Sequence, residues 1–160
     1  SWKVERMTLA GEVLASQTFD VELDAVSHVG LPLAEEIVDY ADAGNELVVA
    51  TASDGAFARV IFNPAEVIGQ KLAAPAEAFE TVASRVDGGV ELKVTATSYV
   101  RDLFCMADKI DAKASVDAGM VSLLPGESVT LRIDTGSDDD PQSFAAANVL
   151  RSANDLKREW

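Results

Sequence analysis

The sequence is poor in the side chains from which most metal and nucleophilic sites are built. It has one cysteine, Cys105, and one histidine, His28, in 160 residues. A single cysteine cannot close an intramolecular disulfide, and the two residues together cannot form a zinc cluster of the usual Cys and His ligands. Cationic side chains are also scarce, with 13 Lys and Arg against 27 Asp and Glu. The formal charge of −14 therefore argues against nucleic acid and anionic membrane surfaces as partners.

Long apolar runs are missing as well. No run approaches the roughly 20 residues of a membrane helix, and the N-terminus does not have the order of a signal peptide. We therefore expect a soluble, cytoplasmic protein. Its hydrophobic content of 48% is sufficient for a packed core, and its length suits one domain or two small ones.

The first half reads as short strands separated by turns. Residues 2–9 alternate in character, a turn follows at Gly11, and residues 13–23 form a second expected strand, so the pair predicts a hairpin. A short strand is expected over 29–33. A second hairpin is expected from strands at 46–51 and 56–62, which end at the strand breaker Asn63-Pro64.

The second half repeats this pattern. Strands are expected over 79–86, 90–100, 102–110, 119–124 and 128–133, with turns at Asp87-Gly88-Gly89 and Pro125-Gly126-Glu127. Strands at this spacing are typical of a sandwich or barrel. We predict an all-β chain with immunoglobulin-like β-sandwiches, a partial one over residues 1–63 and a complete one over 64–136.

The last segment, 137–160, differs in character. It opens with Asp138, Asp139 and Asp140, which form an acidic linker, and continues with apolar residues near helical spacing up to Trp160. We expect a short C-terminal helix here, with an extended tail as the alternative.

The candidate catalytic residues do not form a recognisable site in the sequence. Asp24, Ser27 and His28 lie within five positions, whereas a Ser-His-Asp triad converges from separate elements. Cys105 lies in an apolar run, which favours a buried structural thiol. We predict no catalytic, cofactor-binding or metal-binding residue in this chain.

The abundant carboxylates point to a solvated surface. A glycosidase needs two carboxyl groups flanking the scissile bond, one with a raised pKa, whereas these fall on outward strand faces and in loops. The run 138–140 lacks the ligand spacing of a calcium loop. Aromatic platforms for sugar binding are few, because both Trp2 and Trp160 lie at the chain ends.

Several segments of the second half resemble a known family. The runs VELKVTA at 90–96, YVRDL at 99–103 and VSLLPGESV at 121–129 are similar to the C-terminal sandwich domain of bacterial β-mannosidases of glycoside hydrolase family two. The tail VLRSANDL at 149–156 is similar to the chain ends of some of these enzymes. The run MTLAGEVL at 7–14 resembles a hairpin of the preceding sandwich domain, and residues 63–64 would mark the junction.

The resemblance implies a non-catalytic role for this chain. The catalytic glutamates of that family lie on a (β/α)₈ barrel, which would precede Ser1 and be the partner of this region, so no residue here takes their roles. Glu127 belongs to a turn motif. The resemblance implies an accessory module of an enzyme that hydrolyses terminal β-D-mannosyl residues. A carbohydrate-binding module and an immunoglobulin-like protein-interaction domain are the alternatives.

Association with a second copy is also expected. The first sandwich has about five expected strands before Pro64, whereas an immunoglobulin-type domain has about seven. Open strand edges and an uncovered apolar face favour pairing, so we predict a homodimer.

Overall fold

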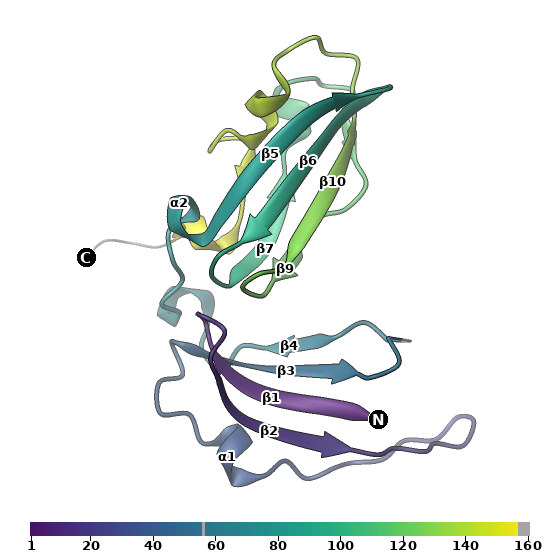
Figure 1. Ribbon diagram of the computed structural model, residues 1–160, viewed down its shortest axis with the longest axis vertical. Helices are drawn as coiled ribbons and strands as arrows, with labels where there is room; N and C mark the ends of the chain where they lie inside the picture. The colour runs from purple at the N-terminus through teal and green to yellow at the C-terminus, as the bar shows by residue number, and fades with distance from the viewer. Residues whose placement is uncertain (56, 157–160) are drawn as a thin grey trace. The chain divides into compact units, whose positions relative to one another are not determined.

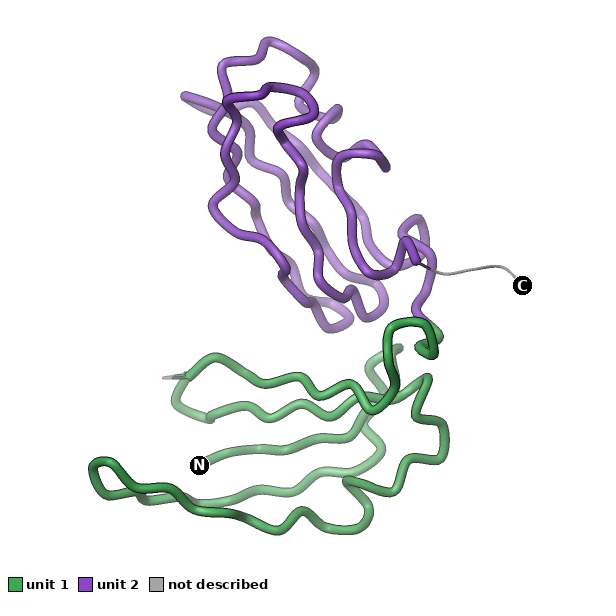
Figure 2. The backbone as a smooth tube through the Cα atoms, turned by 180° about the vertical axis from the view of Figure 1, so that it is seen from behind, with its two compact units in different colours: residues 1–71 green, residues 72–160 purple. Residues whose placement is uncertain are grey.

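The computed structural model describes residues 1–55 and 57–156 and divides the chain after Lys71 into two compact units (Figure 2). Both units consist of antiparallel sheets, and their helices are single short turns. The predicted all-β, sandwich-type class is therefore confirmed. We call residues 1–71 unit 1 and the residues after them unit 2.

Unit 1 contains one four-stranded sheet with the order β2-β1-β3-β4 (Figure 1). Its strands are β1 (Trp2–Thr8), β2 (Val13–Phe19), β3 (Glu46–Ala52) and β4 (Val60–Phe62). A tight turn joins β1 and β2, in which Gly11 has a φ of 90°. The β1–β2 register shifts between Arg6 and Met7, which marks a β-bulge.

One face of this sheet carries a small core. The single helical turn α1 (Glu35–Val38) contacts β1 and β2 and places Ile37 against Val4 and Val48. Phe19 and Ala50 pack against the same cluster. We call this side of the sheet the α1 face.

Unit 2 is a sandwich of two sheets (Figure 1). One sheet has the order β5-β6-β10-β8, with bounds Phe79–Val86, Gly89–Ala96, Ser128–Asp134 and Ser115–Val116. The other has the order β11-β7-β9, with bounds Leu150–Arg151, Val100–Cys105 and Val121–Leu123. Seven strands in sheets of four and three is the strand number of an immunoglobulin constant-type domain.

The sandwich core follows from the alternation of the strands. Leu92 on β6, Leu131 on β10 and Leu103 on β7 are fully buried, while their strand neighbours are more exposed. Because successive side chains of a strand point to opposite faces, each strand contributes one apolar face to the layer between the sheets. Phe144, from the turn η3 (Pro141–Ala145), is fully buried in the same core.

The boundary between the units lies after Lys71, whereas the sequence led us to expect it after Asn63. The intervening segment, which includes the turn η1 (Val67–Gly69), is tied to unit 1. The backbone N–H of Lys71 donates to the carbonyl of Gly44 at 2.8 Å, and Gln70 Nε2 donates to Asn63 Oδ1 at 2.8 Å.

The expected strand over 29–33 does not form. Residues 20–34 have no strand, and Val29, Leu31 and Leu33 are 51%, 41% and 42% exposed. Gln17 holds this segment with its side chain, since Gln17 Oε1 accepts from the N–H of Ala34 at 2.8 Å. A hydrogen bond with a side chain therefore holds this segment, in place of the expected backbone pairing between strands. The strand expected over 13–23 ends at Phe19.

The C-terminal helix expected near 149–160 is also absent from the described residues of that segment. Residues 141–156 instead form η3, β11 and the short 3₁₀ turn η4 (Ala153–Leu156), so they belong to the sandwich. Pro141 opens η3, and Asp140 caps it by accepting from the N–H of Gln142. Trp160, the last residue of the expected helix, lies outside the described residues.

The remaining short helical turns also belong to unit 2. They are α2 (Pro75–Ala78), which leads directly into β5, and η2 (Ala107–Lys109), which follows β7. In the strand expected over 56–62, only Val60–Phe62 is a strand, and Ala56 lies outside the described residues.

Candidate functional site

An open pocket of about 720 Å³ lies between two loops of unit 2. Its lining residues are 110–113, which follow η2, and 134–137, which comprise the last residue of β10 and the loop after it. Asp111 joins these loops, because its carboxylate accepts from Thr135 Oγ1 at 2.7 Å and from the N–H of Gly136 at 3.2 Å. It also accepts from the N–H of Lys113 at 3.0 Å.

These hydrogen bonds determine what the Asp111 carboxylate can do. The N–H of Lys113, the hydroxyl of Thr135 and the N–H of Gly136 lower the pKa of Asp111, because each stabilises the charged form. A carboxylate with a lowered pKa is a poor general acid or base at neutral pH. Asp111 is therefore a structural link between the loops. The other polar side chains that line the pocket are Lys113, Asp134 and the hydroxyls of Thr135 and Ser137.

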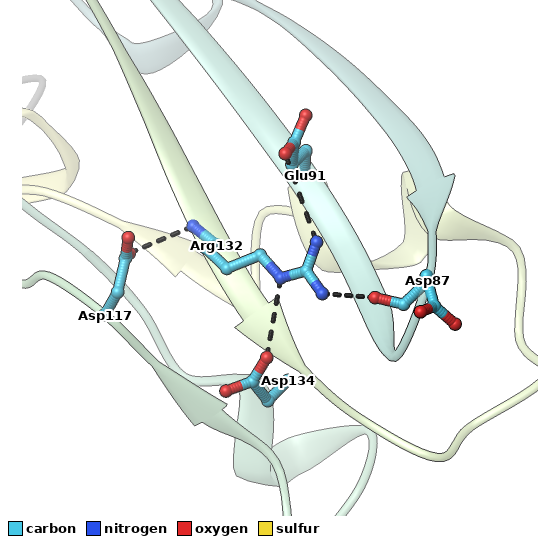
Figure 3. Close-up of polar contacts among 5 residues, drawn as sticks. All are labelled: Asp87, Glu91, Asp117, Arg132 and Asp134. Carbon is cyan, nitrogen blue, oxygen red and sulfur yellow. Dashed lines mark hydrogen bonds and ion pairs between the residues drawn. The ribbon is translucent and has the colours of Figure 1, made fainter.

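A second polar cluster surrounds Arg132 on β10 (Figure 3). The guanidinium lies 3.4 Å from Asp134 and 4.0 Å from Glu91, and it donates to the carbonyl of Asp87. The N–H of Arg132 donates to Asp117 Oδ1 at 2.9 Å. Arg132 thus links β10 to β6, to the β5–β6 turn and to the chain after β8, which is a structural role.

That β5–β6 turn depends on two glycines. Gly88 has a φ of 74°, in the left-handed region that favours glycine. A Cβ on Gly89 would lie 2.0 Å from the carbonyl oxygen of Ile133, so the neighbouring strand leaves no room for a side chain. The Asp-Gly-Gly sequence is therefore fixed by turn geometry and close packing, and it forms no phosphate loop.

The Leu124–Glu127 segment is a type II turn between β9 and β10. Gly126 has a φ of 85°, and the N–H of Glu127 donates to the carbonyl of Leu124 at 3.0 Å. Glu127 Oε2 accepts from the N–H of Leu124 at 2.8 Å. Glu127 therefore stabilises the turn with its side chain.

The structure does not bring Asp24, Ser27 and His28 together as a triad. All three are exposed and lie in the 20–34 segment of unit 1. The hydroxyl of Ser27 donates to the backbone carbonyl of Asp24. Since that hydroxyl is engaged with the backbone, this segment shows no activated nucleophile.

Cys105 ends β7 and is half-buried. Burial raises the pKa of its thiol to about 11, and the nearby charge of Asp108 acts in the same direction. Because the thiolate is the nucleophilic form, Cys105 is unreactive at neutral pH.

The acidic run 138–140 is held by hydrogen bonds. Ser137 Oγ donates to Asp139 Oδ2 at 2.7 Å, and Arg85 on β5 donates to the carbonyls of Ser137 and Asp139. Asp140 caps η3. Among residues 1–55 and 57–156, no group of three or more His, Cys, Asp or Glu side chains is arranged to hold a metal ion.

Unit 1 contains a buried ion pair on the α1 face. Arg6 Nε lies 3.5 Å from Glu46 Oε2, and the two side chains are 14% and 4% exposed. Arg6 also donates to the carbonyl of Asp39, and Glu46 Oε1 accepts from the N–H of Asp42 at 2.8 Å. Burial raises the pKa of the nearby Tyr40, and the charge of Arg6 opposes this. A pocket of about 320 Å³ next to Arg6 is also lined by Leu14, Glu35, Glu36 and Asp39.

Asn154 is a structural residue that the sequence did not reveal. It lies fully buried in η4, and its Nδ2 donates to the carbonyls of Ala73 and Tyr99, each at 3.0 Å. Its Oδ1 accepts from the N–H of Arg101 at 3.0 Å. One amide thus joins three segments of unit 2 that are distant in sequence, and only the tertiary fold shows this.

No family model matches the chain, and no curated protein matches it either. Of the helices in the described part of the chain, none has the length and apolar character needed to cross a bilayer.

Proposed function

We propose that this chain is a non-catalytic accessory module of a β-mannosidase-like glycoside hydrolase. The observation that carries the proposal is the placement of the resembling segments on one sandwich. Residues 90–96 lie on β6, residues 99–103 lead into β7, and residues 121–129 contain β9, a type II turn and the start of β10. The tail at 149–156 adds β11 and η4 to the same unit.

The chemistry of the candidate residues supports a non-catalytic role. Glu127 and Asp111 are engaged in turn and loop contacts, and Cys105 holds its proton at neutral pH. The module would support a (β/α)₈ catalytic barrel or form subunit contacts in an enzyme that hydrolyses terminal β-D-mannosyl residues. A cytoplasmic location is part of the proposal.

Two assays test the proposal. The purified chain alone should release no chromophore from an aryl β-mannoside above the buffer rate, and clear turnover would contradict a non-catalytic role. The chain should also raise the thermal stability of a bacterial β-mannosidase from which the corresponding C-terminal region has been deleted. An unchanged melting temperature of the truncated enzyme, with the chain in excess, would count against module identity.

A carbohydrate-binding module is the second candidate, favoured by exposed aromatic rings in unit 1. Phe57 and Phe62 are 63% and 56% exposed, and the Phe57 ring lies 5.8 Å from that of Trp2. Stacking on a sugar ring would change the emission of Trp2, so titration with β-1,4-mannobiose and soluble mannan distinguishes the two roles. Saturable quenching that Phe57→Ala removes would favour sugar binding.

A further inference from the structure

The α1 face of unit 1 is covered on one side only. α1 packs over β1 and β2, whereas β4 lies at the other edge of the sheet. The register pairs Phe62 with Val48 and Val60 with Ala50. Directly opposed residues of an antiparallel pair point to the same face, so Val60 and Phe62 lie on the α1 face.

These side chains are part of a larger apolar surface. Val60 and Phe62 are 58% and 56% exposed, and Phe57 is 63% exposed. Trp2 is opposite Phe19 in the register, so it lies on the α1 face as well, and its ring contacts Phe57. We call the surface formed by Trp2, Phe57, Val60 and Phe62 the β4 patch.

The β4 patch is an exposed apolar sheet face that no second layer of the described structure covers. A sheet is stable when its apolar face is covered by another element, and contiguous exposed apolar patches mark interaction sites. The rings of Trp2, Phe57 and Phe62 can stack on a sugar, but the indole N–H of Trp2 is the one side-chain hydrogen-bonding group that the four patch residues offer to sugar hydroxyls. An apolar protein surface is therefore a better match to the β4 patch than a carbohydrate.

The charge of unit 1 indicates which protein surface would fit. Residues 1–71 carry twelve carboxylates and four Lys or Arg, a formal charge of −8. Three of these cations already pair with carboxylates of the same unit: Lys3 with Glu5, Arg6 with Glu46, and Lys71 with Asp42. A second copy would bring the same negative charge to the interface, whereas a cationic partner would be attracted.

We infer that the β4 patch is a docking surface for a polypeptide partner that presents an apolar surface rimmed by lysine and arginine. The inference does not depend on glycosidase membership, because it rests on the exposed face and on the charge of unit 1. The homodimer expected from the sequence stays a prediction and is one outcome of the test below.

The test uses the full chain and a labelled synthetic helix of about 14 residues with leucine on one face and lysine on the other. Fluorescence polarisation should show saturable binding that weakens as salt rises. Val60→Ser combined with Phe62→Ser should weaken binding roughly tenfold or more, because most of the apolar contact is lost. Phe57 lies outside any strand, so Phe57→Ser should weaken binding of the helix without disrupting the sheet.

The matched control is Val82→Ser, at an exposed valine on β5 of unit 2, and it should leave binding unchanged.

Three results would overturn the inference. The first is equal binding of a control peptide. A leucine–glutamate helix that binds as well would show that cationic charge is not needed, and a serine–lysine peptide that binds as well would show that apolar contact is not needed. The second is binding that both patch variants leave intact. The third is sedimentation of the chain alone as a dimer that the Val60→Ser, Phe62→Ser variant dissociates, since a second copy would then cover the patch.

Discussion

The two units bury their apolar side chains to different degrees. Unit 2 closes a core between two sheets, whereas the described part of unit 1 has one sheet and one helical turn on the α1 face. Of fifteen large hydrophobic side chains that are exposed among the described residues, twelve lie in unit 1 and three in unit 2. Unit 2 is the longer unit, so the difference does not come from size. Five of the twelve lie in the strand-free 20–34 segment, and Val60 and Phe62 lie where no second layer of described residues covers the α1 face.

This comparison shows that alternation along strands does not by itself produce a core. Full burial of a Leu or Val side chain contributes about 1.5–3 kcal/mol. Unit 2 gains this contribution at many positions of one core. In unit 1 the α1 cluster has three buried members, Val4, Ile37 and Val48, and other buried apolar side chains such as Leu47 and Val49 lie outside that cluster. We expect unit 1 to unfold first, and the following substitutions test that difference.

The largest effect is expected at Phe144. Phe144→Ala should lower the free energy of unfolding of unit 2 by about 3–5 kcal/mol, because it opens a cavity in the sandwich core. Urea titration followed by NMR resolves the two units, and the signals of unit 1 should keep their midpoint. Leu156→Ala, at a side chain 62% exposed, is the control in the same segment. An equally small effect at both positions would mean that η3 does not belong to the core.

A smaller effect, about 3 kcal/mol, is expected for Asn154→Ala. The substitution leaves the carbonyls of Ala73 and Tyr99 and the N–H of Arg101 without this partner in a buried position. The same urea titration reports it, and amide exchange at Arg101 should accelerate. Leu156→Ala, at an exposed side chain of the same turn η4, serves as control. Unchanged exchange at Arg101 would contradict the bridging role of Asn154.

In unit 1, Ile37→Ala should lower the free energy of unfolding by about 2 kcal/mol. This is at the low end for such a substitution, because the cluster around Ile37 is small. We expect the unit 1 signals to shift to lower urea while those of unit 2 remain. Val38→Ala, at the exposed neighbour on the same helical turn, should have little effect. Simultaneous loss of both units would show that they unfold as one cooperative body and do not differ in stability.

The smallest expected effect is on the stability of the two units at acidic pH. The pKa values of Asp42 in unit 1 and Asp111 in unit 2 are both lowered, the first chiefly by its hydrogen bond to Lys71 and the second by the backbone of Lys113. A lowered folded-state pKa contributes stability above the unfolded value of about 3.9, and this is lost as pH falls through the folded value. Asp42→Asn should flatten the acid dependence of unit 1 alone, and Asp111→Asn that of unit 2 alone. A pH profile unchanged by either substitution would contradict these assignments.

Sequence reasoning succeeded where local signals were strong. The strand over 79–86 has the predicted bounds, because alternation precedes an Asp-Gly-Gly turn whose glycines the geometry requires. It failed at 29–33, where the apolar residues Val29, Leu31 and Leu33 suggested a strand but remain exposed. Burial depends on what packs against a segment, and the residues of the segment alone do not determine this.

The polar contacts were the least predictable part. Asn154 looks like an ordinary residue of a polar tail, yet its partners lie 81, 55 and 53 positions away in the sequence. The role of Glu127 was predictable, since Leu-Pro-Gly-Glu has proline and glycine at the positions that a type II turn prefers. Local turn chemistry can be inferred from the sequence, whereas contacts between distant segments require the fold.

The late position of Asn154 and β11 within unit 2 has a consequence for biosynthesis. A ribosome makes the chain from its N-terminus, and domains fold as they become complete. Unit 1 has all of its strands once Lys71 has emerged, whereas the sandwich must wait for β11 and for the amide that joins residues 73, 99 and 101. Until then β7 lacks one of its two neighbouring strands. Unit 2 therefore completes its folding after unit 1, once its strand β11 has been translated, and a nascent chain halted before residue 150 would expose the core of unit 2 to chaperones.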